Sequence, residues 1–229
     1  MARKTYIGYD LGDGETITDV VTLEAGQAIT KTVFDDMTMP NTTTPGQAMP
    51  TIFAFDENGT VIFSQTITVN PEAVRNIIVN FKRRPSDLLK NTSSKTDPEQ
   101  INFLETCSSW PSASDWPDGN SSEMQNFKNS VITFTNAIFS DTDYMNRLKS
   151  VAQTSDEIVF CVGHPTNWSE LDIAIYKLIL KSSILGRGTY GGKKSSVILE
   201  AESRAAFLYA KDVAAFGRLP KSSSVLPLF

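Results

Sequence analysis

One apolar run, residues 157–163 (EIVFCVG), constrains the fold most. It is almost continuously apolar, which is the pattern of a strand buried on both faces. The following segment, SELDIAIYKLILKSSIL, predicts a helix capped by Ser169, with Asp172 three residues on. A second short buried strand is predicted over residues 196–200. Strand, helix and strand in this order predict a right-handed parallel crossover.

The first sixty residues carry the signals of antiparallel strands instead. Strand-like runs at residues 4–11 and 15–23 flank Asp13-Gly14, a pair typical of a type I′ hairpin turn. A second hairpin is predicted over residues 51–63, where DENG separates two apolar runs, and residues 29–34 form a further strand-like run. Hairpins joined to a crossover predict an α/β fold with a mixed sheet and flanking helices.

Apolar residues at helical spacing predict further helices. The first covers residues 71–81, with Asn70 as its cap and Pro71 at its first helical position. Three more helices are predicted over residues 123–139, residues 142–152 and the alanine-rich residues 201–216.

Residues 86–122 differ from their surroundings, because they are rich in Ser, Thr, Asp, Asn and Pro. Trp110 and Trp116 lie in this stretch, and tryptophans in a free linker would lose the benefit of burial. We therefore expect an irregular excursion that packs against the domain rather than a linker.

Composition limits the class of protein. The 229 residues, 40% hydrophobic and 21% charged, fit one large or two small globular units. A net charge of -5 argues against a nucleic-acid binder. Cys107 and Cys161 lack metal-ligand spacing, so neither a disulfide framework nor a zinc site is predicted. Without an apolar signal core or a run of roughly 18 apolar residues, we expect a soluble cytoplasmic protein that does not bind membranes.

Four stretches, in order along the chain, resemble the N-terminal lobe of the DnaK-type heat-shock chaperone ATPases, relatives of actin and the sugar kinases. IGYDLGDGET resembles the first phosphate loop, and MPTIFAFDENGTVIF is similar to the hairpin element that follows it. VNPEAVRNIIVNFKRRP resembles the family's Asn-Pro-Glu helix and its Lys-Arg motif. The stretch from IVFCVGHPTNW to VILEAESRAAFLYA is similar to the strand, helix and E-P-x-A-A-x-x-Y region.

The resemblance implies a ribonuclease-H-like mixed sheet within an actin-like ATPase first lobe. That lobe would span residues 1–229, with residues 1–34 and 151–216 as the core sheet subdomain and residues 35–150 as an outer subdomain. No stretch resembles the family's second phosphate loop, so we expect the first lobe without the second. Whether such a chain is a natural short protein or a truncation is open.

The resemblance also implies a cofactor, ATP or ADP with magnesium, at the first hairpin. Glycines there would let backbone N–H groups point at phosphate oxygens without an intervening side chain. Asp10 would order water around the magnesium ion, although a turn-initiating aspartate is the plain alternative. The expected cofactor-binding residues are Asp10, Leu11, Gly12, Asp13 and Gly14.

Catalytic roles are implied by position in the family motifs. Lys82 matches the lysine that reaches the terminal phosphate, although it also reads as a surface lysine in a basic patch. Glu202 matches the carboxylate that orients the attacking water, although a small shift of the alignment would give Glu200 this role instead. A solvated glutamate at the start of a helix is the structural alternative. With Asp10 these are the expected catalytic residues. His164, the only histidine, is expected to be a loop residue outside the chemistry.

One departure bears on function. The family has two threonines where this chain has Asp13 and Gly14, which adds a negative charge near the phosphates. This charge would weaken nucleotide binding, so the chain alone need not bind nucleotide. Because no stretch resembles the second phosphate loop, ATP hydrolysis is expected only with a second lobe. The alternatives are a non-catalytic binding or scaffold domain and an actin-like or sugar-kinase relative. Protein partners or self-association would use the exposed lobe face.

Overall fold

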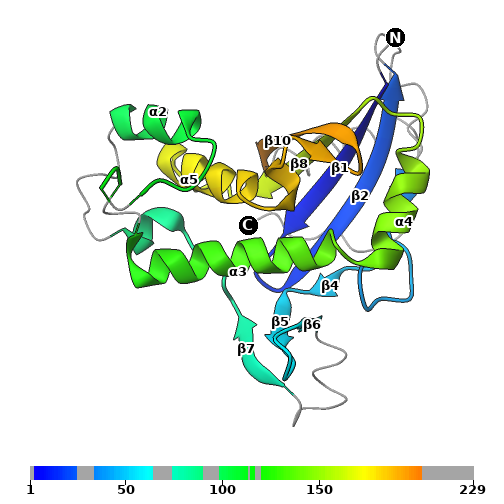
Figure 1. Ribbon diagram of the computed structural model, residues 1–229, viewed down its shortest axis with the longest axis horizontal. Helices are drawn as coiled ribbons and strands as arrows, with labels where there is room; N and C mark the ends of the chain where they lie inside the picture. Colours follow the sequence, from blue (N-terminus) through cyan, green and yellow to red (C-terminus); the bar gives the residue numbers. More distant parts are fainter. Residues whose placement is uncertain are drawn as a thin grey trace, which may run out of the picture.

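The protein is a mixed α/β structure in which a curled sheet carries helices on the face seen in Figure 1. The computed structural model describes residues 3–24, 34–63, 74–89, 98–112, 114–116 and 120–202. The mixed sheet with flanking helices that the sequence predicts is confirmed.

The main sheet has the strand order β3-β2-β1-β8-β10-β9, and β4 pairs with β2 beside this path. Its strands are β1 (Arg3–Leu11), β2 (Glu15–Glu24), β3 (Phe34–Asp36), β4 (Met49–Pro50), β8 (Glu157–His164), β9 (Thr189–Tyr190) and β10 (Lys193–Ala201). β1 and β2 are antiparallel, whereas β8 lies between β1 and β10 and is parallel to both. The first hairpin and the parallel crossover are therefore confirmed.

The crossover helix, α5 (Glu170–Lys181), begins with the predicted capping box. The Ser169 hydroxyl accepts from the Asp172 N–H, and the Asp172 carboxylate accepts from the Ser169 N–H at 2.8 Å. Such reciprocal bonds satisfy two N–H groups that a helix start leaves without partners. Eight of its twelve residues are buried, so α5 packs as a core element of the crossover.

Two more predicted helices are confirmed as α3 (Ser122–Ile138) and α4 (Thr142–Val151), which lie in front of the sheet in Figure 1. Buried hydroxyls tie them to the strands. Tyr9 and Thr135 share a hydrogen bond of 3.1 Å from β1 to α3, and Tyr144 donates to Thr18 at 2.9 Å from α4 to β2. Among the described helices, none combines the length and apolarity needed to cross a lipid bilayer.

A small antiparallel sheet lies below α3 in Figure 1, with the order β6-β5-β7. Its strands are β5 (Ile52–Phe55), β6 (Val61–Phe63) and β7 (Arg75–Val79). The β5–β6 hairpin was predicted, but the helix predicted over residues 71–81 is wrong where the structure describes it. The β-branched run from Ile77 to Val79 favours a strand. Asn76 and Asn80 also adopt φ values of 53° and 50°, which a right-handed helix excludes.

The excursion over residues 86–122 is less irregular than predicted. It contains the end of a short 3-10 helix, η2 (Pro85–Leu88), and a helix, α2 (Pro98–Thr106), which packs on α5. Trp110 and Trp116 pack together with ring centroids 5.3 Å apart, and Trp116 is buried as expected.

Other predictions fall partly outside the described residues. These are most of the strand at residues 29–34, the cap and start of the helix at residues 70–73, and the helix beyond Glu202.

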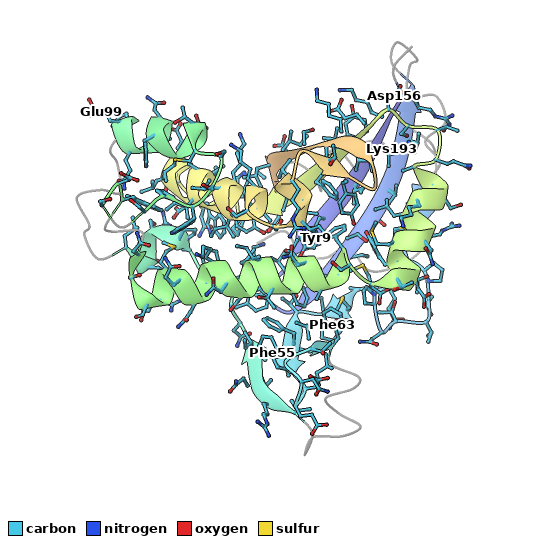
Figure 2. The ribbon with its side chains drawn as sticks, viewed as in Figure 1. Tyr9, Phe55, Phe63, Glu99, Asp156 and Lys193 are labelled. Carbon is cyan, nitrogen blue, oxygen red and sulfur yellow. The ribbon has the colours of Figure 1, made fainter. Side chains whose placement is uncertain are left out.

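Aromatic side chains join the small sheet to the rest of the molecule. Phe134 on α3 contacts Phe53, Phe63 and Phe81, with ring centroids between 5.4 and 5.9 Å apart. Figure 2 shows Phe63 on the small sheet and Tyr9 on the main sheet, on either side of α3. Phe81, two residues beyond the end of β7, is thereby fixed against α3.

Replacing Phe134 with alanine is expected to lower the free energy of unfolding by about 3–5 kcal/mol, because the ring is fully buried and its loss leaves a cavity. Chemical denaturation followed by circular dichroism measures this change. Phe103→Ala is the control, since Phe103 is 38% exposed on α2 and should cost far less. Equal losses for the two variants would contradict the packing described.

Candidate functional site

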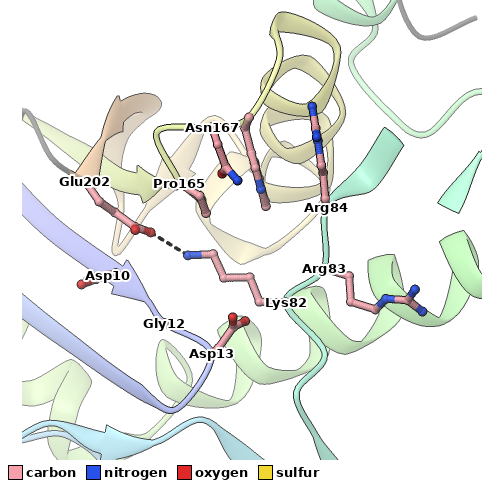
Figure 3. A pocket seen from close by; sticks show the side chains of 10 residues that line it. Asp10, Gly12, Asp13, Lys82, Arg83, Arg84, Pro165, Asn167 and Glu202 are labelled. Carbon is pink, nitrogen blue, oxygen red and sulfur yellow. Dashed lines mark hydrogen bonds and ion pairs between the residues drawn. The ribbon is translucent and has the colours of Figure 1, made fainter. Parts of the chain in front are cut away.

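A cleft of about 360 Å³ opens where β1, the segment after β7 and the loop before α5 meet (Figure 3). Its walls carry charges of both signs together with two residues suited to close packing against a ligand, a proline and a tryptophan. The lining residues are Asp10, Gly12, Asp13, Lys82, Arg83, Arg84, Pro165, Asn167, Trp168 and Glu202.

The β1–β2 loop forms the floor of this cleft. The Gly12 N–H donates to the Glu15 carbonyl at 3.0 Å, and a Cβ on Gly12 would lie 2.4 Å from that carbonyl oxygen. Only glycine fits there. The predicted type I′ turn is wrong, because that turn needs positive φ at Asp13 and Gly14 and neither residue has it. The glycine that the loop requires is therefore Gly12.

Gly14 and Leu11 lie beside the cleft without lining it. The Gly14 carbonyl accepts from the N–H of Thr51, the residue between β4 and β5, at 2.9 Å. Leu11 is fully buried in the core. Their expected cofactor contacts stay predictions, whereas Asp10, Gly12 and Asp13 face the cleft directly.

Gly12→Ala is expected to lower the free energy of unfolding by about 1–3 kcal/mol, because the new Cβ forces the backbone at Glu15 to move. Gly14→Ala is the matched control, since a Cβ there would meet nothing within 4 Å. Thermal melts of the two variants give the comparison. A Gly14→Ala variant that is destabilised as much as Gly12→Ala would contradict the loop geometry.

Lys82 reaches across the cleft to the opposite wall (Figure 3). Its ammonium lies 2.8 Å from the Glu202 carboxylate, although the two residues are 120 positions apart in sequence. The Lys82 side chain is only 4% exposed and that of Glu202 is 40% exposed. A lysine this buried requires an anionic partner, because removing an ammonium from water without one is costly. The surface-lysine interpretation of Lys82 is therefore wrong.

Asp10 and Glu202 lie over Gly163, the second-last residue of β8. A Cβ on Gly163 would lie 3.2 Å from Glu202 Cγ and 3.6 Å from Asp10 Oδ1, so glycine leaves room for both carboxylates. Partial burial raises the pKa of Asp10, the charge of Glu202 raises it further, and Lys82 lowers it. Asp10 thus carries a carboxylate whose charge is incompletely compensated.

The raised pKa of Asp10 gives a signed prediction. Ionising Asp10 costs folding free energy, so its contribution becomes less favourable as the pH rises through its folded-state pKa. Asp10→Asn is therefore expected to raise the melting temperature at pH 7. The difference should vanish below about pH 3, where the aspartate is mostly protonated in both states. Thermal melts across this pH range measure the difference in Tm, with Asp13→Asn as the control. A lower Tm at pH 7 for Asp10→Asn would contradict the prediction.

Asp172 fixes the segment that carries Lys82. Its carboxylate is fully buried, and it accepts from the Ser86 N–H at 2.7 Å and from Arg84 Nε at 3.0 Å. Burial raises the pKa of Asp172, but hydrogen bonds from Ser169, Ser86 and Arg84 outweigh it, so the pKa lies below its ordinary value. Asp172 therefore stays ionised and holds the chain just past Lys82 against α5.

The structure places the remaining candidates plainly. Glu202 lines the cleft, whereas Glu200 lies within β10 and does not. His164 is the buried last residue of β8 rather than a loop residue, and its Nδ1 lies 3.0 Å from the Pro165 carbonyl oxygen. Among the described residues, no three His, Cys, Asp or Glu side chains are grouped to hold a metal ion.

Sequence reasoning missed part of the cleft. Asn167 and Trp168 follow β8 and line the wall opposite the hairpin, but their motif carried no functional signal. Asp172 was recognised only as part of a capping box, because nothing in the sequence shows that Arg84 and Ser86 reach it. Neither a protein-family model nor a curated protein matches this chain.

Proposed function

We propose that this cleft binds the phosphate groups of a nucleotide together with magnesium, as the first lobe of a DnaK-type ATPase. The observation that carries the proposal is the meeting of three separate motifs. Asp10 and Gly12 come from the first hairpin, Lys82 comes from FKRRP, and Glu202 comes from AESRAAFLY. The strand order β3-β2-β1-β8-β10 supports a ribonuclease-H-like sheet, because it combines an antiparallel hairpin with a parallel crossover.

The chemistry of each wall suits a phosphate. The backbone at Gly12 can approach phosphate oxygens closely because no side chain intervenes. Lys82 has three N–H donors, so its ammonium can contact a phosphate oxygen while one donor remains on Glu202. A magnesium ion near Asp10 would neutralise phosphate charge and take its other ligands from water and phosphate oxygens. Asp10 and Glu202 would then hold the water molecules that surround it.

The charges of the cleft predict weak affinity in the isolated chain. Lys82 is paired with Glu202, and Arg84 is paired with the buried Asp172. Arg83 is exposed and points away from Lys82 in Figure 3, while Asp10 and Asp13 face the cleft. A phosphate must therefore share the Lys82 ammonium with Glu202, and it needs a divalent cation against the two aspartates. Hydrolysis is assigned only to an assembly that includes a second lobe.

A non-catalytic scaffold domain is the second candidate function, and the same charges favour it. Asp13 stands where the family has a hydroxyl donor, and the cation that reaches furthest into the cleft is already paired. In this case the ion pair between Lys82 and Glu202 would serve to close the cleft. Phosphate binding separates the two candidates, because a scaffold domain of this kind would bind none.

Ligand-observed NMR with ADP and magnesium tests the proposal directly. We expect binding with a Kd on the order of 1 mM, a loss of binding without magnesium, and about tenfold weaker binding for Lys82→Met. Lys149→Met, an exposed lysine on α4, is the matched control and should bind as the unchanged chain does. Absent binding by the unchanged chain, or equal binding by Lys82→Met, would contradict the proposal and favour the scaffold candidate.

A further inference from the structure

Asp172 makes more hydrogen bonds than a helix cap needs. Its carboxylate accepts from the N–H and the hydroxyl of Ser169 at 2.8 and 2.7 Å, which serves the start of α5. It also accepts from the Ser86 N–H and from Arg84, which belong to a segment far away in sequence. One fully buried carboxylate thus joins two segments of chain.

A second aspartate in the same protein shows what capping alone requires. Asp141 caps α4 by accepting from the Tyr144 N–H at 2.9 Å, and it is only partly buried. Burying an ionised carboxylate is costly unless several donors compensate it. The burial of Asp172 and its additional hydrogen bonds therefore indicate a structural role beyond capping α5.

The two segments that Asp172 joins both line the cleft. Arg84 lies two residues after Lys82 in the segment that follows β7, and Ser169 directly follows Asn167 and Trp168. On its other side, Lys82 follows Phe81, whose ring packs 5.4 Å from that of Phe134. Lys82 consequently lies between two fixed neighbours, Phe81 packed on α3 and Arg84 bonded to Asp172.

We propose that Asp172 is a positioning residue that holds Lys82 inside the cleft and thereby sets the affinity of the cleft for phosphate. The affinity part rests on the proposed function, whereas the positioning part does not. Asp172 contacts neither the cleft space nor Lys82, so it acts through Arg84 and Ser86.

Asp172→Asn is the sharpest perturbation. The amide keeps one oxygen acceptor but places an NH₂ donor among the donors from Ser169, Ser86 and Arg84. It also removes the charge that holds Arg84, whose side chain is 41% exposed and free to turn toward solvent. The segment after Lys82 should then leave α5, and the Lys82 side chain should become accessible.

The positioning is tested by acetylating surface amines and following each lysine by mass spectrometry. Lys82 should react at least tenfold faster in Asp172→Asn than in the unchanged chain, while the exposed Lys149 reacts at the same rate in both. Asp141→Asn is the matched control, because it makes the same change at a helix cap away from the cleft, where an amide oxygen can still accept from the Tyr144 N–H. It should leave the Lys82 rate unchanged. An unchanged Lys82 rate in folded Asp172→Asn would overturn the proposal, as would an equal increase in Asp141→Asn.

A second variant covers the case in which Asp172→Asn fails to fold. Arg84→Met removes one tether and leaves the Ser169 and Ser86 bonds to Asp172 in place. Circular dichroism verifies folding, and the Lys82 rate should rise by less than the tenfold expected for Asp172→Asn. An unchanged Lys82 acetylation rate in folded Arg84→Met would also overturn the proposal.

The affinity part is tested with ADP and magnesium as the probe. Asp172→Asn should weaken binding about as much as Lys82→Met, and the double variant should bind no more weakly than either, because both act through one ammonium. Additive losses would overturn this part. If the unchanged chain binds no ADP, the proposed function fails, but the Lys82 reaction rates still decide whether Asp172 positions that residue.

Discussion

The buried ammonium of Lys82 is the constraint on which the rest of the cleft depends. A lysine side chain that is 4% exposed must have a partner of opposite charge, and Glu202 provides it at 2.8 Å. For this pair to form, the end of β10 and the segment after β7 must come together. The aromatic contacts of Phe81 with Phe53 and Phe134 and the hydrogen bonds of Asp172 bring the second of these segments into place.

The sheet brings the other half of the cleft to the same place. Parallel strands end at one edge of a sheet, and the loops beyond their carboxyl ends are a common position for ligand sites. Here Asp10 lies near the end of β1, Gly163 near the end of β8, and Glu202 directly after β10. The parallel alignment of these three strands thus accounts for two carboxylates beside one lysine.

The sequence predicted features that depend on neighbouring residues. The capping box at Ser169 and Asp172 needs only a spacing of three residues, and the first hairpin and β8 follow from alternating or continuous apolar runs. The same reasoning failed at β7, where apolar residues at helical spacing concealed a β-branched run that pairs with β5. It also failed at the first turn, whose geometry is set by the contact between Gly12 and Glu15. The link from Asp172 to Ser86 spans 86 positions, and no local pattern records it.

The most direct test of the account is an NMR titration in which assigned backbone amides are followed as ADP and magnesium are added. If the cleft binds phosphate, the largest shifts should fall on the amides of Gly12, Asp13 and Gly163 and on those next to Lys82, and they should disappear without magnesium. A separate pocket lies between α4 and β9, around Leu148 and Tyr190. Shifts confined to that pocket, or no shifts at millimolar ADP, would contradict a phosphate site at this cleft.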